Sequence, residues 1–172
     1  WKNGRVKKKI LRNYLNIRIQ DKFKESKKPK YFPNVSLFKI DDFQLNKFFY
    51  KQIGKKHNWK DRLIWKDKEW TNYLSNEKIY TFVLKNKEEL IGYFELILHK
   101  EKKESEIAYF GILEEFIGNK IGGFLLSEAI KVSFLLKAES VWVHTCSLDH
   151  PNAIKNYIAR GMKIFKQEEV II

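Results

Sequence analysis

The sequence holds one cysteine, one methionine and three prolines among its 172 residues. A single cysteine, Cys146, excludes an intrachain disulfide and is typical of a reducing compartment, so we expect a cytoplasmic protein. Because the only methionine is Met162, we expect Trp1 to lie inside a longer gene product. No apolar run is long enough to span a bilayer, and no segment has the pattern of a signal peptide. These absences predict a domain held by its own core, for which 44% of the residues are apolar.

Metal and nucleophile chemistry also has little support in the sequence. The four histidines and the cysteine are scattered without the close spacing of a metal site, so we expect no bound metal. His144 lies in a segment of the buried-strand type and His150 precedes Pro151, and both positions favour structural roles. No feature around Cys146 indicates an activated thiolate. We therefore look for acid–base and ligand-binding residues elsewhere in the chain.

Positive charge is abundant, at a net +13, and it is concentrated near the N-terminal end. Residues 1–30 hold twelve Lys and Arg against two acidic residues, which leaves a net +3 for the other 142 residues. Such a basic arm could contact the phosphates of a nucleic acid. The excess is mostly lysine, however, and the aromatic residues stand in core-like periodic positions outside the basic run. A lysine-rich solvated surface is the favoured interpretation, and nucleic acid is a disfavoured partner.

Apolar periodicity divides the chain into a basic N-terminal strand and linker, residues 1–32, and one α/β domain, residues 33–172. Predicted strands cover 11–19, 35–40, 79–86, 90–98, 105–113, 141–147 and 163–172. Predicted helices cover 43–54, 67–74, 122–137 and 152–160, framed by the glycines at 54 and 161 and by Pro151. An antiparallel meander that leads into a strand–helix–strand unit predicts a mixed α/β, or α+β, fold.

The segment "FGILEEFIGNKIGGFLL", Phe110 to Leu126, is the most informative one in the chain. A strand ends near Ile112, and glycines at 118, 122 and 123 lead into a helix. A helix N-terminus offers unpaired N–H groups and a positive dipole end, which together suit a pyrophosphate. The glycine spacing and the missing Gly-Lys-Ser/Thr exclude a dinucleotide fingerprint and a Walker A loop.

Two segments in order, "EFIGNKIGGFLLSEAI" and "NAIKNYIARGMKIF", resemble the GNAT superfamily of acyl-CoA N-acyltransferases. The second places Ala153, Tyr157 and Gly161 at the family's Ala, Tyr and Gly. Upstream, "HNWKDRLIWKDKEW", "GYFEL" and "EIAYFG" look like a bacterial subgroup, so the resemblance covers residues 35–172. It implies a mixed, mostly antiparallel central sheet, splayed near its middle, with helices on both faces. It also implies N-acetyl transfer from acetyl-CoA to a primary amine by direct attack on the thioester.

The resemblance implies which residues contact the acyl-CoA. Backbone groups of the strand before the loop would pair with the pantetheine arm, here at Ile112 and Leu113. Asn152 would lie along the cofactor. The N–H groups that would hold the pyrophosphate belong to Gly118, Asn119, Lys120, Ile121, Gly122 and Gly123. The chain departs from the family pattern at Ile117, where the family has Arg or Gln, and at Lys120, where the family has glycine.

The resemblance also implies the catalytic and acceptor residues. Tyr157 matches the tyrosine that protonates the departing thiolate, and Glu106 lies on the strand that often carries the base. Glu95 is the rival base and, with Trp59, Asp61 and Trp65, a candidate contact of the acceptor. The same tryptophans would equally form a hydrophobic clamp on the sheet.

The acceptor is a small-molecule amine or a protein amine, with a slight preference for the small molecule. A homodimer through edge strands near the termini is compatible with this layout. The first alternative is a non-catalytic acyl-CoA-binding protein, suggested by the departures at Ile117 and Lys120. The second is a nucleic-acid-binding module that uses the basic arm.

Overall fold

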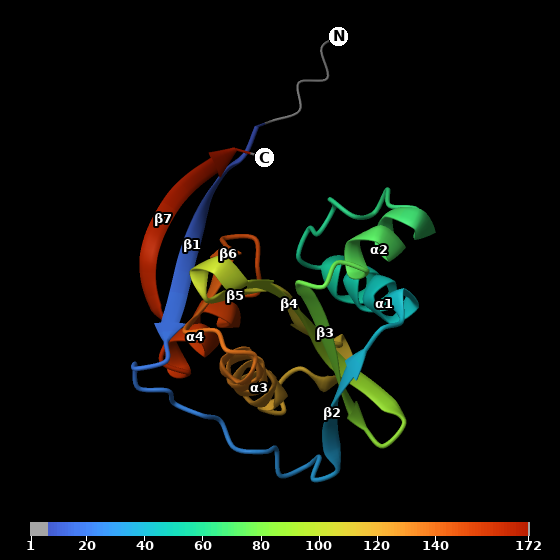
Figure 1. Ribbon diagram of the computed structural model, residues 1–172, viewed down its shortest axis with the longest axis horizontal. Helices are drawn as coiled ribbons and strands as arrows, with labels where there is room; N and C mark the ends of the chain where they lie inside the picture. The colour runs from blue at the N-terminus through green and yellow to red at the C-terminus, as the bar shows by residue number, and fades with distance from the viewer. Residues whose placement is uncertain (1–6, 172) are drawn as a thin grey trace.

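The protein is represented by a computed structural model that describes residues 7–171 (Figure 1). Lys2 and Arg5 of the basic arm and Ile172 of the last predicted strand lie outside the described residues. The elements, in chain order, are β1 Lys9–Arg18, β2 Val35–Ile40, α1 Phe43–Gly54, α2 Asp67–Leu74, β3 Ile79–Asn86, β4 Glu89–His99, η1 Lys100–Lys102, β5 Glu104–Ile112, η2 Glu114–Phe116, α3 Ile121–Leu135, β6 Ser140–Cys146, α4 Asn152–Ala159 and β7 Lys163–Ile171.

The described strands form one seven-stranded sheet in the order β2-β3-β4-β5-β6-β1-β7. The β5–β6 pair is parallel, and the other neighbouring pairs are antiparallel. The predicted mixed, mostly antiparallel sheet is confirmed. Most element boundaries also lie within about two residues of the prediction, which is the scatter expected at element ends.

Helices cover both faces of the sheet, as adjacent residues of β4 demonstrate. The ring of Tyr93 stacks on Phe49 of α1, with centroids 4.9 Å apart. The next residue back, Gly92, faces the other way, and a Cβ added there would lie 3.2 Å from Cδ2 of Leu125 on α3. Successive residues of a strand point to opposite faces. The sheet therefore has an α1 face, which also carries α2, and an α3 face, which also carries α4 (Figure 1).

Strand β1 is an inner strand of the sheet. It pairs with β6 on one side and β7 on the other, and its residues Leu15 and Ile17 are completely buried. The following linker returns across α3 and α4, where Ser26 N–H donates to Ser127 Oγ at 2.8 Å. The division into residues 1–32 and 33–172 stays a prediction, but β1 shares one sheet and one core with the rest of the chain.

The sheet opens between β5 and β6. A β-bulge places Ala108 as an extra residue of β5, between Ile107, which pairs with Leu96, and Tyr109, which pairs with Glu95. Parallel pairing with β6 covers residues 104–106 of β5, and the rest of that strand leads away. The central splay that we expected is therefore present, and it lies beside the loop that leads into α3.

Candidate functional site

The gap between the C-terminal ends of β5 and β6 opens into a cavity of about 500 Å³. Three segments line it: the end of α1, the β5–α3 loop and the β6–α4 loop. Its lining residues are Lys56, His57, Glu114, Ile117, Leu148, Asp149, His150 and Pro151. A cavity where strands part and two helices begin is a common position for a ligand in α/β proteins.

Backbone groups of β5 face this gap at alternate positions. Leu113 N–H donates to the carbonyl oxygen of Ile91 at 2.8 Å, so this N–H is used inside the sheet. Along an antiparallel strand, alternate residues direct their N–H and C=O groups to opposite sides. Ile112 therefore directs its groups away from β4, toward the side where β6 is not paired with it. Of the two predicted pantetheine contacts, Ile112 has the free backbone groups, and the N–H of Leu113 is already engaged.

The glycine loop presents a row of backbone donors at the start of α3. Gly118 has φ +95°, and Lys120, the residue before the helix, has φ 60°, so both are in the left-handed region. Among the described residues, the N–H groups of 118–123 donate no hydrogen bond to another backbone or side-chain group. A Cβ on Gly122 would meet only Nδ2 of Asn156, at 3.7 Å, so the space in front of the first turn is open. Free donors and open space fit a pyrophosphate.

Lys120 stands at a position that the resembling family fills with glycine, yet its backbone adopts the left-handed conformation that glycine would favour there. Ile117 is 48% exposed and lines the cavity without supplying a polar group. The two departures change the side chains around the loop, and Lys120 has a left-handed backbone.

Residues that the sequence analysis did not single out also surround the loop. Asn156 Nδ2 donates to the carbonyl oxygen of Gly122 at 3.1 Å and ties α4 to the start of α3. Arg160 lies so close that an added Cβ on Gly123 would be 2.7 Å from its guanidinium, and burial lowers the pKa of this arginine. Asn152, which the sequence analysis did predict as a cofactor contact, is exposed at the first turn of the same helix. A signal was present, because 152, 156 and 160 repeat at four-residue spacing and share one face of a helix.

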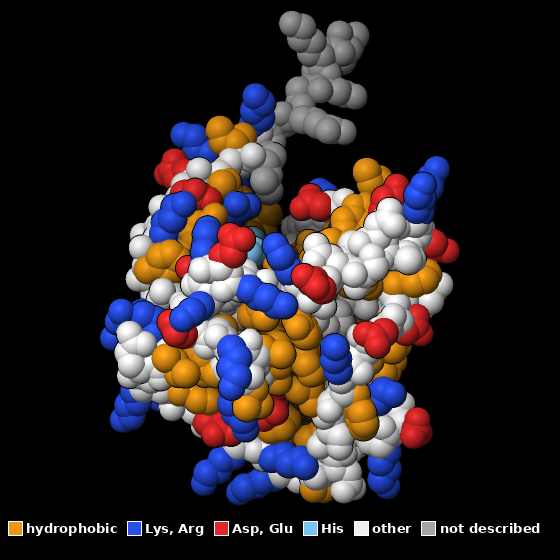
Figure 2. Space-filling model, viewed as in Figure 1, with side chains coloured by type: hydrophobic (Ala, Val, Ile, Leu, Met, Phe, Trp, Pro, Cys, Tyr) orange, Lys and Arg blue, Asp and Glu red, His pale blue; other side chains and the backbone are white. Residues whose placement is uncertain are grey.

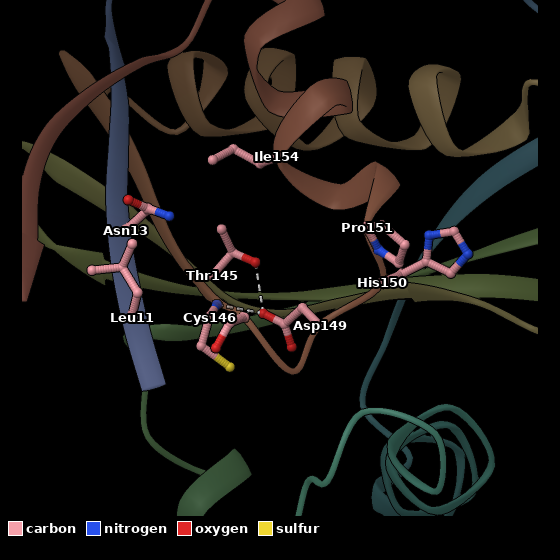
Figure 3. A pocket seen from close by; sticks show the side chains of 9 residues that line it. Leu11, Asn13, Thr145, Cys146, Asp149, His150, Pro151 and Ile154 are labelled. Carbon is pink, nitrogen blue, oxygen red and sulfur yellow. Dashed lines mark hydrogen bonds between the residues drawn. The ribbon is translucent and has the colours of Figure 1, made fainter. Parts of the chain in front are cut away.

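Tyr157 is the buried residue of α4, with 7% of its surface exposed. Burial, and then the negative charge of Asp149, raise its pKa well above the usual tyrosine value. The hydroxyl therefore carries its proton throughout the neutral range. Asp149 is held in the β6–α4 loop by Thr145 Oγ1 at 2.7 Å and by Cys146 N–H at 2.9 Å (Figure 3).

A smaller cavity of about 160 Å³ lies beside Asp149, between β1 and the start of α4. Figure 3 shows Leu11 and Asn13 of β1 on one side of it and Ile154 of α4 on another. Both cavities are lined by Asp149, His150 and Pro151, so the β6–α4 loop is their shared wall.

Glu106 lies on the α1 face of β5, next to the splay. Its Oε1 is 3.1 Å from Nε2 of His99 on β4, and the His99 ring stacks on Trp142 of β6 with centroids 6.5 Å apart. The side chain of Glu106 is 18% exposed, and that of His99 is 37% exposed. This carboxylate is positioned by a neighbour and still reaches solvent, which a general base requires.

Glu95 lies on the same face of the sheet in a different environment. It is completely buried, and Arg62 donates to both of its oxygens, at 2.9 and 3.1 Å. Asn46 Nδ2 adds a third hydrogen bond at 3.2 Å. Burial acts to lower the pKa of Arg62, but the charge of Glu95 and their hydrogen bonds raise it overall. The two side chains therefore form a fixed, charged pair.

Five aromatic rings enclose this ion pair, each within 6 Å of the Arg62 guanidinium. We call the set the Arg62 cluster: Arg62, Glu95, Tyr50, Trp65, Trp70, Tyr73 and Tyr109. Burial raises the pKa of Tyr109 to about 12. Arg62 thus occupies the aromatic surroundings that suit a cation, and an acceptor amine cannot reach Glu95 while it remains there.

Of the predicted acceptor residues, Trp65 and Glu95 belong to the Arg62 cluster, and Trp59 and Asp61 lie outside it. Trp65 contacts Arg62 and Trp70, so it belongs to the cluster. Trp59 packs on Tyr109 with centroids 5.0 Å apart and lies next to His57 at the cavity wall. Asp61 is exposed beside them. His57 lines the larger cavity, and burial lowers the pKa of His57.

Figure 2 shows apolar side chains gathered over the middle of this view, where α3 lies, with Lys and Arg distributed around them. Acidic side chains are interspersed, and one pairing is Lys131 with Glu25 at 2.6 Å. Among residues 7–171, no group of three His, Cys, Asp or Glu is arranged to hold a metal ion. Within the same residues, no helix has both the length and the apolar composition to cross a membrane.

The fold and this site define an α/β domain with a splayed sheet and a helix N-terminus whose N–H groups are free at the splay. The profile of the acetyltransferase (GNAT) family matches residues 40–162, more than half of the chain. The chain belongs to the GNAT family, as its sequence motifs predicted. A search among curated proteins found no match.

Solved structures of acetyltransferases share this fold. A GCN5-related N-acetyltransferase from Sphaerobacter thermophilus superposes with a TM-score of 0.68 at 14% identity, covering 94% of this chain and 50% of its own. An aminoglycoside acetyltransferase from an uncultured soil metagenomic sample gives 0.63 at 14% identity, covering 77% and 89%. The IAA acetyltransferase from Bacillus cereus gives 0.55 at 19% identity, covering 77% and 79%. The chain thus spans half the length of the Sphaerobacter protein, and these likenesses concern the fold.

Proposed function

We propose that this domain transfers an acetyl group from acetyl-CoA to a primary amine, in the cytoplasm, by direct attack of the amine on the thioester. The observation that carries the proposal is the splay between β5 and β6, which ends at unbonded N–H groups of residues 118–123. A pantetheine arm needs backbone groups to pair with, and a pyrophosphate needs several N–H donors that point toward it. The end of β5 and the start of α3 would provide these two kinds of group next to each other. Ile112 supplies the first, and the start of α3 supplies the second.

Binding would place the diphosphate against Gly118, Asn119, Lys120, Ile121, Gly122 and Gly123. Lys120 and Arg160 add positive charge close to these donors, which partly replaces the arginine or glutamine missing at Ile117. Asn152 is exposed at the start of α4 and remains a proposed contact. The thioester end would then reach toward Tyr157 and the β6–α4 loop.

The proposed reaction needs one base and one acid. Glu106 takes a proton from the ammonium form of the acceptor, directly or through His99, so that a neutral amine attacks the carbonyl carbon. A C–N bond forms, the nitrogen loses its second proton to solvent, the C–S bond breaks, and the thiolate takes a proton from the hydroxyl of Tyr157. Its raised pKa keeps the hydroxyl protonated before the reaction, and solvent restores the proton afterwards.

Glu106 is preferred over Glu95 as the base because of the Arg62 pair. A general base has to change its protonation state, and Glu95 is completely buried with Arg62 on both oxygens. The amine would approach over the α1 face, between Glu106 and Trp59. Trp65 and Glu95 would lie behind the residues that contact the amine and would hold them in place. Asp61 would be an outer contact of the amine.

The acceptor class stays open between a small amine and a protein amine, with the small amine preferred. The approach is bounded by Trp59, which is partly exposed and lies outside the Arg62 cluster, and an aromatic face there suits a small or extended cation. The metagenomic neighbour is named as an aminoglycoside acetyltransferase, so polyamines and aminoglycosides are sensible first members of a test panel.

The test is a turnover assay that follows CoA thiol release with acetyl-CoA across a panel of primary amines. We expect amine-dependent release with the wild-type chain and at least about tenfold slower release with Tyr157→Phe, since loss of a general acid removes a proton-transfer contribution. Tyr80→Phe, a hydroxyl deletion on β3 away from the gap, is the matched control. Binding of acetyl-CoA without release for any amine would favour the non-catalytic alternative that Ile117 and Lys120 suggest.

A further inference from the structure

The sheet ends on one side at β7, whose strand neighbour is β1. No residue of Lys163–Ile171 is buried, and Ile164, Phe165 and Ile171 are 42%, 53% and 61% exposed. An edge of this length presents a row of unpaired backbone groups and is a template for another strand. The opposite edge, β2, is a shorter strand of six residues that follows Pro33.

The hydrogen-bond pattern of β1 shows which residues of β7 face outward. Ser147 N–H donates to the carbonyl oxygen of Leu11, so Leu11 and the residues alternating with it face β6. Arg12 therefore faces β7, where its partner is Glu168. It follows that Gln167 and Glu169 direct their backbone N–H and C=O groups away from β1 into solvent.

The charges of β7 are arranged so that the strand complements itself. Lys163 and Lys166 stand in its first half, and Glu168 and Glu169 stand in its second half. If two copies pair in antiparallel fashion with Gln167 opposite Gln167, Lys166 of each copy faces Glu168 of the other. Moving the two-fold axis by one residue, to position 166 or to position 168, would place Lys166 opposite Lys166 or Glu168 opposite Glu168. Opposite charges across strands stabilise a pair, and like charges destabilise it.

The side chains at this position are already held in place. Tyr14 donates its hydroxyl hydrogen to Glu168 at 2.5 Å, and the ammonium of Lys166 lies 5.0 Å from the centre of the Tyr14 ring. Two charged side chains with ordered neighbours lose less freedom on pairing than free surface side chains do. The outward backbone groups allow an axis at Gln167 or at Glu169, and the charge pattern favours Gln167.

We propose that a second copy of this chain binds here, β7 to β7 in antiparallel fashion about Gln167, so that one sheet continues through a two-fold axis. The interface is isologous, because the same strand is presented by both copies. The dimer forms whether or not the domain is an acetyltransferase, since the gap between β5 and β6 takes no part in it.

The test uses two single charge reversals, Lys166→Glu and Glu168→Lys, measured alone and mixed by sedimentation velocity and native mass spectrometry. The wild-type chain is expected to dimerise as its concentration rises. Each variant alone has only like charges facing at the axis, so its dimer should be weaker by about tenfold or more. The mixture restores both opposite-charge pairs and should form a heterodimer of one chain of each kind.

A second pair of variants tests the backbone contacts. Gln167→Pro removes an outward N–H and leaves the bonds to β1 in place, so it should abolish dimerisation with little change in melting temperature. Gln167→Thr keeps the N–H and should still dimerise. A wild-type chain that stays monomeric overturns the proposal. A dimer that survives both Gln167→Pro and Lys166→Glu also overturns it, because the interface would then lie elsewhere.

Discussion

Two glutamates on one face of the sheet, Glu95 of β4 and Glu106 of β5, have opposite environments. Glu95 is completely buried, with Arg62 on both oxygens and Asn46 as a further donor. Glu106 is 18% exposed and is held by His99, whose ring is partly open to solvent. The residue type is the same and the strands are adjacent, yet one carboxylate is enclosed in a buried ion pair and the other reaches solvent.

The difference comes from what covers each position. α1, α2 and the loop between them cover the β3–β5 part of the sheet and bring Arg62 and its aromatic neighbours onto Glu95. Glu106 lies next to the splay, where its neighbour is Trp142 of β6. A buried ion pair stabilises a fold only while both partners are present. A catalytic carboxylate needs access to substrate and solvent. Here Glu95 takes the buried structural role, and Glu106 has the access that the catalytic role needs.

The largest effect is expected for Glu95→Gln. The substitution leaves the Arg62 guanidinium buried without a counter-charge, which should cost about 3–5 kcal/mol of unfolding free energy. Urea denaturation measures this, with Glu89→Gln, an exposed position at the start of the same strand, as control. A loss below about 1 kcal/mol, the range of an exposed pair, would contradict the burial argument.

A double variant tests whether the unpaired buried charge is what destabilises Glu95→Gln. Replacing both partners with apolar residues, Arg62→Met with Glu95→Leu, should cost less than Glu95→Gln alone, because no buried charge is left unpaired. Denaturation of the single and double variants under one set of conditions checks this. A double variant that is less stable than both singles would show that the charges themselves are needed.

The next largest effect is expected for Glu106→Gln, which should lower activity strongly and change stability little, unlike Glu95→Gln. We expect a stability change within about 1 kcal/mol, since the site is partly exposed, and a fall in kcat of about a hundredfold from the loss of the base. Glu101→Gln, in the exposed turn between β4 and β5, is the matched control. His99→Gln should cause a smaller loss and alter the pH profile. Full activity of Glu106→Gln would remove it from the mechanism.

The smallest effect is the alkaline limit of stability. Burial raises the pKa of Tyr109 to about 12, and it also raises the pKa values of Tyr50, Tyr73, Tyr93 and Tyr157. The folded state therefore holds these protons more tightly than the unfolded state, so stability is full below pH 10 and falls as the pH rises toward 12. Melting temperatures across this range measure it, and Tyr109→Phe should reduce the slope. A flat profile would contradict the burial of the hydroxyls.

Much of the fold could be predicted from the sequence, and the reasons are local. The alternation in the β3–β4 hairpin and the framing of α4 by Pro151 and Gly161 placed these elements within about two residues. The place of β1 could not be predicted in this way. Its alternation shows that it is a strand, but pairing between residues 9–18 and residues 140–171 is a long-range contact without a sequence signal.

In the candidate site too, the residues set by local structure could be predicted from the sequence, and those set by tertiary packing could not. The glycine loop and Tyr157 follow from motif spacing, because helix N-termini and turns are local structures. The Arg62–Glu95 pair joins residues 33 positions apart through tertiary packing, so "GYFEL" alone suggested a base at Glu95. The role of Asn156 in tying α4 to Gly122 likewise depends on how two helices meet.

The most direct measurement is isothermal calorimetry with acetyl-CoA and with CoA on the wild-type chain and on Gly122→Trp. Space in front of Gly122 is open, so an indole there should leave the fold intact and cover the free N–H groups of the loop. Leu135→Trp, at the exposed far end of α3, is the matched control. The account predicts binding of both ligands that Gly122→Trp abolishes and Leu135→Trp retains, with equal melting temperatures. Undiminished binding by Gly122→Trp, or no binding by the wild-type chain, would contradict it.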